Sequence, residues 1–226
     1  MRFDRLALAA VALATLAAAP RADSLPTGRL TYRITIDGQP HGEQILTVRR
    51  AAPDRYAITM DAPAIGQRWD ASSDGDFRPV AAKLEMPTRA GPYAMALDYG
   101  AGRVTGTHGT TATPVDDALP PGTIDQRIDW AYVAAARLPR GGRLAFRVYD
   151  PATKVSRAEA HGLGLRWVDV GGRRTSVRST AYRIVKAGGT EHYVVHVAAA
   201  GPAIMVREDM PNGLRIDLID FTASPR

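Results

Sequence analysis

The sequence contains no cysteine among its 226 residues. This absence excludes a disulfide framework, a thiol nucleophile and a metal site built on thiolates. It also excludes a lipid anchor of the bacterial lipoprotein kind, which is attached to a cysteine. The stability of the fold must therefore come from an apolar core. A mature chain of about 200 residues can build one, because it buries roughly 70% of its unfolded surface.

Lysine is almost as rare, since Lys83, Lys154 and Lys186 are the only lysines. Arginine therefore supplies nearly all of the positive charge behind the net charge of +6. A basic surface favours anionic partners such as lipid head groups, acidic polysaccharide or nucleic acid. The arginines are scattered singly through alternating segments, however, and the tightest pairs, at 49–50 and 173–174, stand in or beside expected turns. This distribution argues against nucleic acid as a partner.

Long apolar runs are absent except at the N-terminus. There a basic start precedes an apolar run at 6–16 and a cluster of small residues at 17–22. This order is typical of a secretory signal peptide. The run has about half of the roughly 20 residues that a membrane-spanning helix needs, which argues against a retained anchor. We expect residues 1–22 to be a signal peptide, cleaved somewhere within 17–22, and the mature protein to be soluble in the periplasm without a membrane span.

Alternation of apolar and polar residues dominates the rest of the chain. Every second residue from Leu30 to Ile36 is apolar. Because successive side chains on a strand point to opposite faces, this pattern predicts a strand with one buried face. The pattern recurs about a dozen times, separated by turn signals such as 211–213. We expect a single β-rich domain covering residues 23–226.

One segment breaks the alternation. Thr123, followed three residues later by Gln126, matches a capping box at the start of a helix. The sequence predicts an amphipathic helix over 123–138 and a crossing loop over 105–122, which is rich in Thr, Gly and Pro. The expected fold is mostly β, an antiparallel open barrel or strongly curved sheet partly wrapped around this helix. The apolar face of the predicted helix consists of Ile124, Ile128, Ala131 and Ala135.

His192 and His196 are the first residues that suggest a site. They stand four apart in a segment whose Tyr-Val-Val sequence predicts a strand. On a strand they share a face but lie roughly 13 Å apart, at about 3.3 Å per residue. That separation is too large for both to bind one metal ion. We predict solvent-facing histidines and no metal site.

Two acidic clusters are also considered. The segment 70–76 offers oxygen ligands for calcium, or a serine nucleophile, but its spacing does not match a helix–loop–helix calcium site and no histidine is near in sequence. Asp116 and Asp117 form a pair suited to acid–base chemistry, although adjacent residues rarely converge on one substrate and a negative pair stabilises a helix N-terminus. We predict a polar turn and a structural pair. The first cluster consists of Asp70, Ser72, Ser73, Asp74 and Asp76.

Aromatic side chains come from many of the predicted elements. If the sheet curves around the helix, some of them line the space between the two, and a mostly apolar space with a few polar groups is what a ligand site looks like. An ordinary core has the same composition, so both interpretations stay open. The predicted cavity-lining residues are Tyr32, Tyr56, Trp69, Trp130, Tyr132, Phe146 and Trp167, and Tyr93 is a further aromatic of this set.

The order of these elements resembles an uncharacterised family of exported Gram-negative proteins, domain of unknown function 3108. That family is similar in shape to the periplasmic lipoprotein carriers, in which an open β-barrel wraps one or a few helices around an apolar cavity. The resemblance implies such a shape and carries over no catalytic residues. The single predicted helix departs from the several helices of the carriers. The residues that carry the resemblance are Tyr32, Gly38, Gly42, Tyr56, Ser72, Ser73, Gly75, Pro79, Asp116, Asp117, Gly141, Gly142, Tyr182 and the strand pair at 202–219.

The sequence contains no phosphate loop, dinucleotide fingerprint or zinc-protease motif. The leading hypothesis is a non-enzymatic periplasmic carrier that binds an apolar or amphipathic, lipid-like ligand in cell-envelope maintenance, without a cofactor. A second hypothesis is an envelope assembly or interaction factor that binds polymers or outer-membrane proteins through sheet edges or a basic face. A third is an exported hydrolase built on His, Asp and Ser residues distant in sequence. The oligomeric state stays open.

Overall fold

The computed structural model describes residues 19–224, so the predicted signal peptide lies outside the described residues up to position 18. The fifteen strands of residues 19–224 belong to one sheet, in the order β8-β7-β6-β5-β4-β3-β2-β1-β15-β14-β13-β12-β11-β10-β9. The strands of the first half are β1 (Gly28–Ile36), β2 (Gln39–Ala52), β3 (Arg55–Ala62), β4 (Gln67–Asp74), β5 (Pro79–Thr88), β6 (Gly91–Gly100), β7 (Arg103–Gly109) and β8 (Thr113–Ala118). Those of the second half are β9 (Thr123–Asp125), β10 (Arg143–Asp150), β11 (Lys154–Val170), β12 (Arg173–Lys186), β13 (Gly189–Ala198), β14 (Met205–Asp209) and β15 (Leu214–Ala223).

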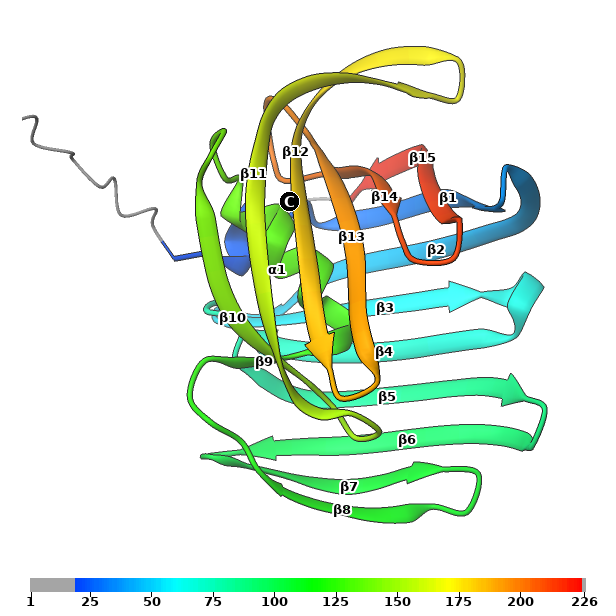
Figure 1. The fold of residues 1–226 in the computed structure, drawn as a ribbon, viewed down its shortest axis with the longest axis vertical. Coiled ribbons are helices and arrows are strands. Elements are labelled where there is room, and N and C mark those ends of the chain that lie inside the picture. Colours follow the sequence, from blue (N-terminus) through cyan, green and yellow to red (C-terminus); the bar gives the residue numbers. More distant parts are fainter. Residues whose placement is uncertain (1–18, 225–226) are drawn as a thin grey trace, which may run out of the picture.

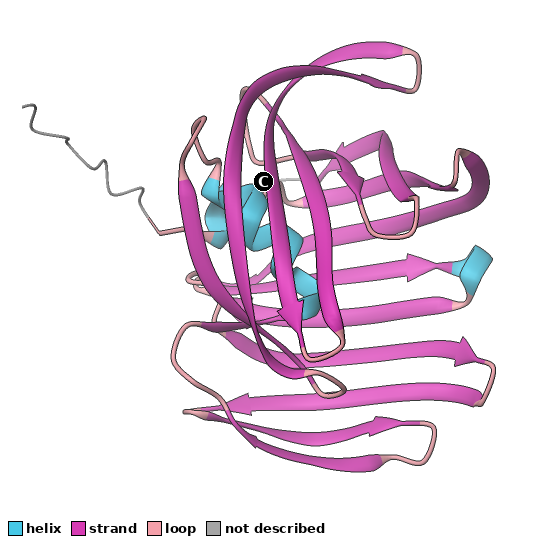
Figure 2. Cartoon of the chain, in the orientation of Figure 1, coloured by secondary structure: helices cyan, strands magenta, loops and turns pink. Residues whose placement is uncertain are grey.

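The sheet is open and strongly curved. Strands β8 and β9 are its two free edges, and every neighbouring pair is antiparallel except β9 and β10. In Figure 1, β1 to β4 run behind the helix α1 (Asp129–Ala136), β5 to β8 continue the sheet below it, and β10 to β13 cross in front of it. One apolar core joins the helix to strands from both halves of the sheet. The predicted class, a curved antiparallel sheet partly wrapped around one helix, is confirmed (Figure 2).

Strand β1 shows how alternation builds this core. Leu30, Tyr32 and Ile34 are buried, whereas Arg29, directly before Leu30, and Arg33, between Tyr32 and Ile34, are exposed. The Tyr32 hydroxyl donates a hydrogen bond of 2.9 Å to the carbonyl oxygen of Met205 on β14. The polar end of this fully buried ring is therefore satisfied, and the ring ties two strands together across the core.

The predicted start of the helix is wrong. Thr123 belongs to β9, and its hydroxyl donates to the carbonyl of Pro120 instead of capping a helix. Helical structure begins with the 3₁₀ turn η3 (Gln126–Ile128), where the Asp125 carboxylate accepts a hydrogen bond of 2.8 Å from the backbone N–H of Arg127. An aspartate one residue before the turn therefore does the capping that the sequence assigned to Thr123.

The helix ends at a residue in the left-handed conformation. Arg137 has φ 44°, a backbone conformation that is sterically strained for residues other than glycine. Its guanidinium donates to the carbonyl oxygens of Gly201 (2.6 Å) and Ala198 (2.9 Å), which lie after and within β13. These bonds hold the strained residue and fix the helix to the sheet. None of the helices in residues 19–224 is long and apolar enough to cross a membrane.

The predicted crossing loop at 105–122 is also wrong. Most of this segment forms the hairpin of β7 and β8, in which Val104 and Val115 are buried. Gly106 permits close pairing with β6, because a Cβ at this position would lie 2.0 Å from the carbonyl oxygen of Ala96. The threonine and glycine content of 105–122 therefore does not distinguish a loop from a strand. Threonine favours strands, and pairing with a neighbouring strand overrides a loop-like composition.

Candidate functional site

A cavity of about 290 Å³ lies inside the fold, between the sheet and the start of α1. Strands from both ends of the chain, β1 to β4 and β13 to β15, contribute to its walls together with β12, η3 and α1. The residues that form most of the wall are apolar, as in typical small-molecule sites. Six of them are Ile34, Leu46, Met60, Met205, Leu214 and Ile216.

Two tryptophans of the predicted set line this cavity. Trp69 comes from β4 and Trp130 from the first turn of α1, and each is 8% exposed. The indole N–H of Trp130 donates a hydrogen bond of 3.1 Å to the carbonyl of Arg127. This bond fixes the ring orientation and leaves the indole face available to the cavity.

Two buried carboxyl groups, Asp129 and Glu208, also line the cavity, and both are 5% exposed. The hydroxyl of Tyr182 lies 3.0 Å from Glu208 Oε1 and 3.4 Å from Asp129 Oδ1. Burial, reinforced by the negative charge of Asp129, raises the pKa of Glu208 to about 8. Burial likewise raises the pKa of Asp129 to about 7, although the backbone N–H of Trp130 favours its charged form.

The two carboxyl groups therefore hold protons that ordinary carboxylates lose. Near neutral pH Glu208 is mostly a carboxylic acid, which both donates and accepts hydrogen bonds. An apolar cavity with such a group suits a ligand that is mainly apolar and carries a polar end.

Arg127 separates this pair from a second acidic cluster. Its guanidinium pairs with Asp125 and, at 2.7 Å, with Asp150, and its side chain is 7% exposed. Burial opposes the charged guanidinium, but the two carboxylates outweigh that effect and raise the pKa of Arg127. The Tyr99 hydroxyl donates to Oδ2 of Asp125, which also accepts a hydrogen bond of 2.9 Å from Arg127 Nη2. This ion-pair network joins β6, β9 and β10 and fixes the residues at the start of α1.

The other predicted lining residues lie elsewhere. Tyr32 and Tyr56 are buried in the core outside the cavity wall. Tyr132 packs against Phe146 (5.1 Å between ring centroids) and Phe77 (5.4 Å), in a cluster that does not line the cavity. These residues are part of the packed core, which was the other interpretation left open by the sequence.

Trp167 and Tyr93 are placed differently again. Trp167 is 61% exposed near the end of the hairpin of β11 and β12. Tyr93 is half-buried on β6, with its ring 6.4 Å from that of His108. The structure thus brings together Trp69 and Trp130 alone from the predicted set, and ligand binding by any member stays a prediction.

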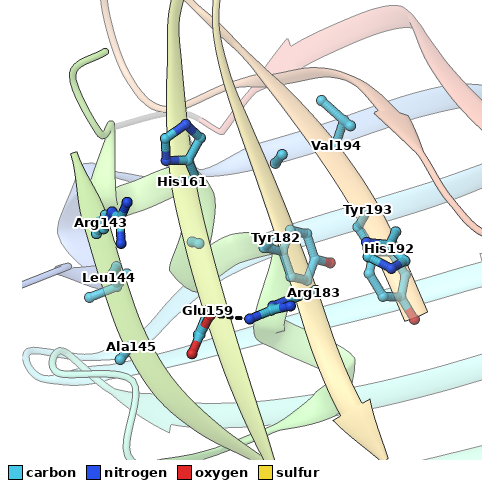
Figure 3. Close-up of a pocket in the computed structure, with 12 residues that line it drawn as sticks. Arg143, Leu144, Ala145, Glu159, His161, Tyr182, Arg183, His192, Tyr193 and Val194 are labelled. Carbon is cyan, nitrogen blue, oxygen red and sulfur yellow. Dashed lines mark hydrogen bonds and ion pairs between the residues drawn. The ribbon is translucent and has the colours of Figure 1, made fainter. Parts of the chain in front are cut away.

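A larger and more open hollow, of about 500 Å³, lies on the outer face of β10 to β13. Figure 3 shows its basic and histidine side chains, which come from four neighbouring strands: Arg143 from β10, His161 from β11, Arg183 from β12 and His192 from β13. Arg183 is already paired with Glu159 at 2.7 Å.

His196 corrects the prediction of two solvent-facing histidines. His192 is exposed, but His196 is buried, with Nδ1 2.8 Å from Ser179 Oγ and Nε2 3.1 Å from Asp209 Oδ2. Burial works to raise the pKa of Asp209, but hydrogen bonds from His196 and Arg215 outweigh it and hold that pKa at about 2. Ser179 is fully buried, so no substrate reaches its hydroxyl in this structure.

The two acidic clusters have structural partners. Asp74 accepts hydrogen bonds from the backbone N–H groups of Asp76 and Arg78, which builds the turn expected at the end of 70–76. Asp116 pairs with Arg103, and Asp117 accepts from the Tyr149 hydroxyl at 2.5 Å. The pair stands on β8 rather than directly before a helix, because 113–118 is strand.

Sequence reasoning missed the carboxyl pair. Its members come from α1 and β14, and the hydroxyl between them comes from β12, so no sequence spacing joins them. A signal existed for Glu208. It pairs with the buried Val195 across β13 and therefore occupies an inward position of an alternating strand, where a charged residue is rarely found unpaired.

A sequence model described as "Protein of unknown function (DUF3108)" matches residues 31–163, more than half of the chain. The chain belongs to the DUF3108 family. The comparison with curated proteins found no match. The fold of this DUF3108 protein is similar to the crystal structure of a β-barrel-like protein of domain of unknown function DUF1849 from Brucella abortus. The TM-score is 0.60 at 12% identity, over 89% of this chain and 99% of that chain.

Two other solved structures are more distant from this DUF3108 protein. The hypothetical lipoprotein YmcC from Escherichia coli aligns with a TM-score of 0.38 at 10% identity, over 87% of this chain and 88% of that chain. A protein with a YmcC-like fold from Bacteroides fragilis aligns with a TM-score of 0.35 at 10% identity, over 88% and 98% of the two chains.

Proposed function

We propose that this protein is a non-enzymatic binding protein that holds an apolar or amphipathic, lipid-like ligand in the interior cavity. The observation that carries the proposal is a cavity with a largely apolar wall that contains two buried carboxyl groups, Asp129 and Glu208, whose pKa values burial raises to about 7 and about 8. Its volume of about 290 Å³ corresponds to the lower end of the range for small-molecule sites. The ligand is therefore one chain or ring system, or one such part of a larger lipid.

The polar groups orient the ligand. Its apolar part packs between Trp69 and Trp130 and the aliphatic wall, where burial of apolar surface drives binding. Its polar end, a hydroxyl or carbonyl group, exchanges hydrogen bonds with Glu208 and Asp129. Tyr182 uses only part of the hydrogen-bonding capacity of the two carboxyl groups, and the remaining capacity favours amphipathic molecules over pure hydrocarbons.

Binding of an apolar fluorescent probe, N-phenyl-1-naphthylamine, tests the proposal. The variant Gln44→Trp adds an indole to the cavity wall at a half-buried position. We expect the wild type to enhance the probe's emission with saturation and the variant to bind at least about tenfold more weakly, because a filled cavity excludes the probe. The matched control is Gln39→Trp, since Gln39 is exposed beside the β1–β2 turn and lines no cavity described above.

The two variants make the result decisive. Saturable binding that Gln39→Trp retains and Gln44→Trp loses supports the interior site. Absence of binding by the wild type, or equal binding by both variants with unchanged thermal unfolding, contradicts it.

Export and organisation are part of the same proposal. The signal-like N-terminus favours export to the periplasm. The lack of cysteine favours a protein without a lipid anchor, and we assign it to cell-envelope maintenance. The single sheet that includes all strands of residues 19–224 favours one domain after the signal peptide.

The two other functions have less support. Strand addition at the free edge β8 is hindered by Pro114, which lacks a backbone N–H, and by the acidic pair beside it. A hydrolase that uses Ser179 and His196 needs an accessible hydroxyl, and Ser179 has 0% exposure.

A further inference from the structure

The hairpin of β11 and β12 extends beyond the rest of the sheet. Strand β10 pairs with β11 only as far as His161, and β13 pairs with β12 only as far as Val177. Residues 165–176 therefore continue as a two-stranded ribbon, which curls away at the top of Figure 1. The ribbon starts at an irregularity between Gly162 and Gly164, where the register shifts.

One face of this ribbon is fixed to the body of the protein. Val170 and Val177 pack with Val206 of β14 in a small apolar cluster of their own. The guanidinium of Arg207 donates to the backbone carbonyl of Asp169. The ribbon therefore holds a defined orientation, and its other face is presented outward.

That outward face is apolar and basic. Leu165 and Trp167 are 65% and 61% exposed, more than any other large apolar side chain in residues 19–224. Their cross-strand partners are Arg178 and Ser176, and the guanidinium of Arg174 lies 5.3 Å from the centre of the Trp167 ring. Paired residues share a face, so an indole and a leucine stand beside two guanidinium groups.

The charge of the ribbon has one sign. Residues 165–178 contain four arginines and one aspartate, a net charge of +3. The carboxylate of Asp169 is occupied, because it accepts a hydrogen bond of 3.0 Å from the backbone N–H of Gly172. Arg166, Arg173 and Arg174 are exposed.

We infer that this ribbon docks the protein on the surface of a bilayer that contains anionic phospholipid. Tryptophan favours the boundary between acyl chains and head groups, and arginines nearby attract anionic head groups. The aliphatic stem of an arginine also lies on apolar surface while its guanidinium reaches phosphate. A narrow ribbon enters a head-group layer more readily than it forms the flat interface of about 800 Å² per partner that a stable protein complex needs.

Vesicle flotation and tryptophan emission test the inference on the protein in its exported form. Two vesicle types are compared, phosphatidylglycerol with phosphatidylethanolamine, and phosphatidylcholine alone. Trp69 and Trp130 are each 8% exposed, so a change in emission on binding reports Trp167. We expect flotation and a blue shift with the anionic vesicles only, both weakened by added salt.

Substitutions distinguish the contribution of the ribbon to vesicle binding from that of the protein's net positive charge. Trp167→Ala lowers the partition coefficient at least about tenfold, through loss of apolar burial. Arg174→Ser, at the arginine whose guanidinium lies over the Trp167 ring, lowers it about fivefold. The controls are Val185→Ser, at an apolar side chain that is 46% exposed on the same hairpin, and Arg49→Ser, at an exposed arginine of the β2–β3 hairpin. Both controls retain wild-type partitioning.

Two results overturn the inference. One is absence of flotation with anionic vesicles at low salt. The other is flotation that Trp167→Ala leaves unchanged, since net charge alone then accounts for binding. Neither result bears on the interior cavity, because none of the substituted residues lines it.

Discussion

The hydroxyl of Tyr182 lies 3.0 Å from Oε1 of Glu208, inside the cavity and away from bulk solvent. Both residues come from the sheet, and Asp129 approaches the same hydroxyl from the helix at 3.4 Å. The Tyr182 hydroxyl thus links two strands of the sheet to the helix that the sheet wraps around. Protonation of the two carboxyl groups affects both the stability of the fold and the chemistry that a ligand meets.

Stability should fall as the pH rises through neutrality. An unfolded glutamate ionises near its ordinary pKa of 4.5, whereas Glu208 in the fold keeps its proton up to about pH 8. Between these values the folded state binds the additional proton, so the free energy of unfolding falls by about 1.4 kcal/mol per pH unit for this group. We expect Glu208→Gln to remove this contribution. Between pH 4 and pH 8 the variant should therefore lose less unfolding free energy than the wild type loses.

Urea unfolding of the wild type and Glu208→Gln at several pH values measures the slope. Glu191→Gln is the control, because Glu191 is only partly buried and lies outside the cavity lining. Parallel pH profiles for the wild type and Glu208→Gln would contradict the raised pKa of Glu208.

Removing Arg127 should destabilise the fold strongly. Arg127→Met leaves Asp125 buried without its cation, and breaking a buried ion pair in this way costs about 3–5 kcal/mol. Chemical denaturation measures the loss. Arg103→Met is the matched control, because the Arg103–Asp116 pair is exposed on both sides and we expect nearly unchanged stability. Equal effects of the two substitutions would argue against a structural role of the buried network.

The Ser179–His196–Asp209 group should be structural. Ser179→Ala removes the partner of a buried imidazole nitrogen, at a cost of about 1–3 kcal/mol in unfolding free energy. Thermal unfolding checks this, with Ser72→Ala at a half-buried serine as the control. Hydrolysis of p-nitrophenyl esters by the wild type, lost in Ser179→Ala at a temperature where the variant is folded, would instead establish a nucleophile.

Alternation was sufficient to predict most of the sheet. The buried positions of β1 follow from its sequence, and the predicted turn at 211–213 lies between β14 and β15. The segment 105–122 was mispredicted because its pairing depends on β6, and composition alone does not reveal a neighbouring strand. The helix start was mispredicted because Asp125, not Thr123, caps the first helical turn. The Asp125 carboxylate accepts from the backbone N–H of Arg127 and also pairs with its guanidinium.

The candidate site could be predicted only in outline. Trp69 and Trp130 were expected to line a cavity, and the structure puts both on its wall. The carboxyl pair could not be foreseen, because the curvature of the sheet brings β12 and β14 to the helix. His196 shows the same limit, since its burial depends on Ser179 and on β14, both remote in sequence from the motif that drew attention to it.

The most direct measurement is native mass spectrometry of the wild type and of Gln44→Trp. Each protein is exported and purified from the cell envelope of its own cells, and any bound molecule is then recovered by organic extraction. A ligand in the cavity predicts a wild-type mass above that of the polypeptide, an extracted amphipathic molecule that accounts for the difference, and loss of both in Gln44→Trp. A wild-type mass equal to that of the polypeptide, together with no saturable binding of N-phenyl-1-naphthylamine, would contradict the proposed binding function.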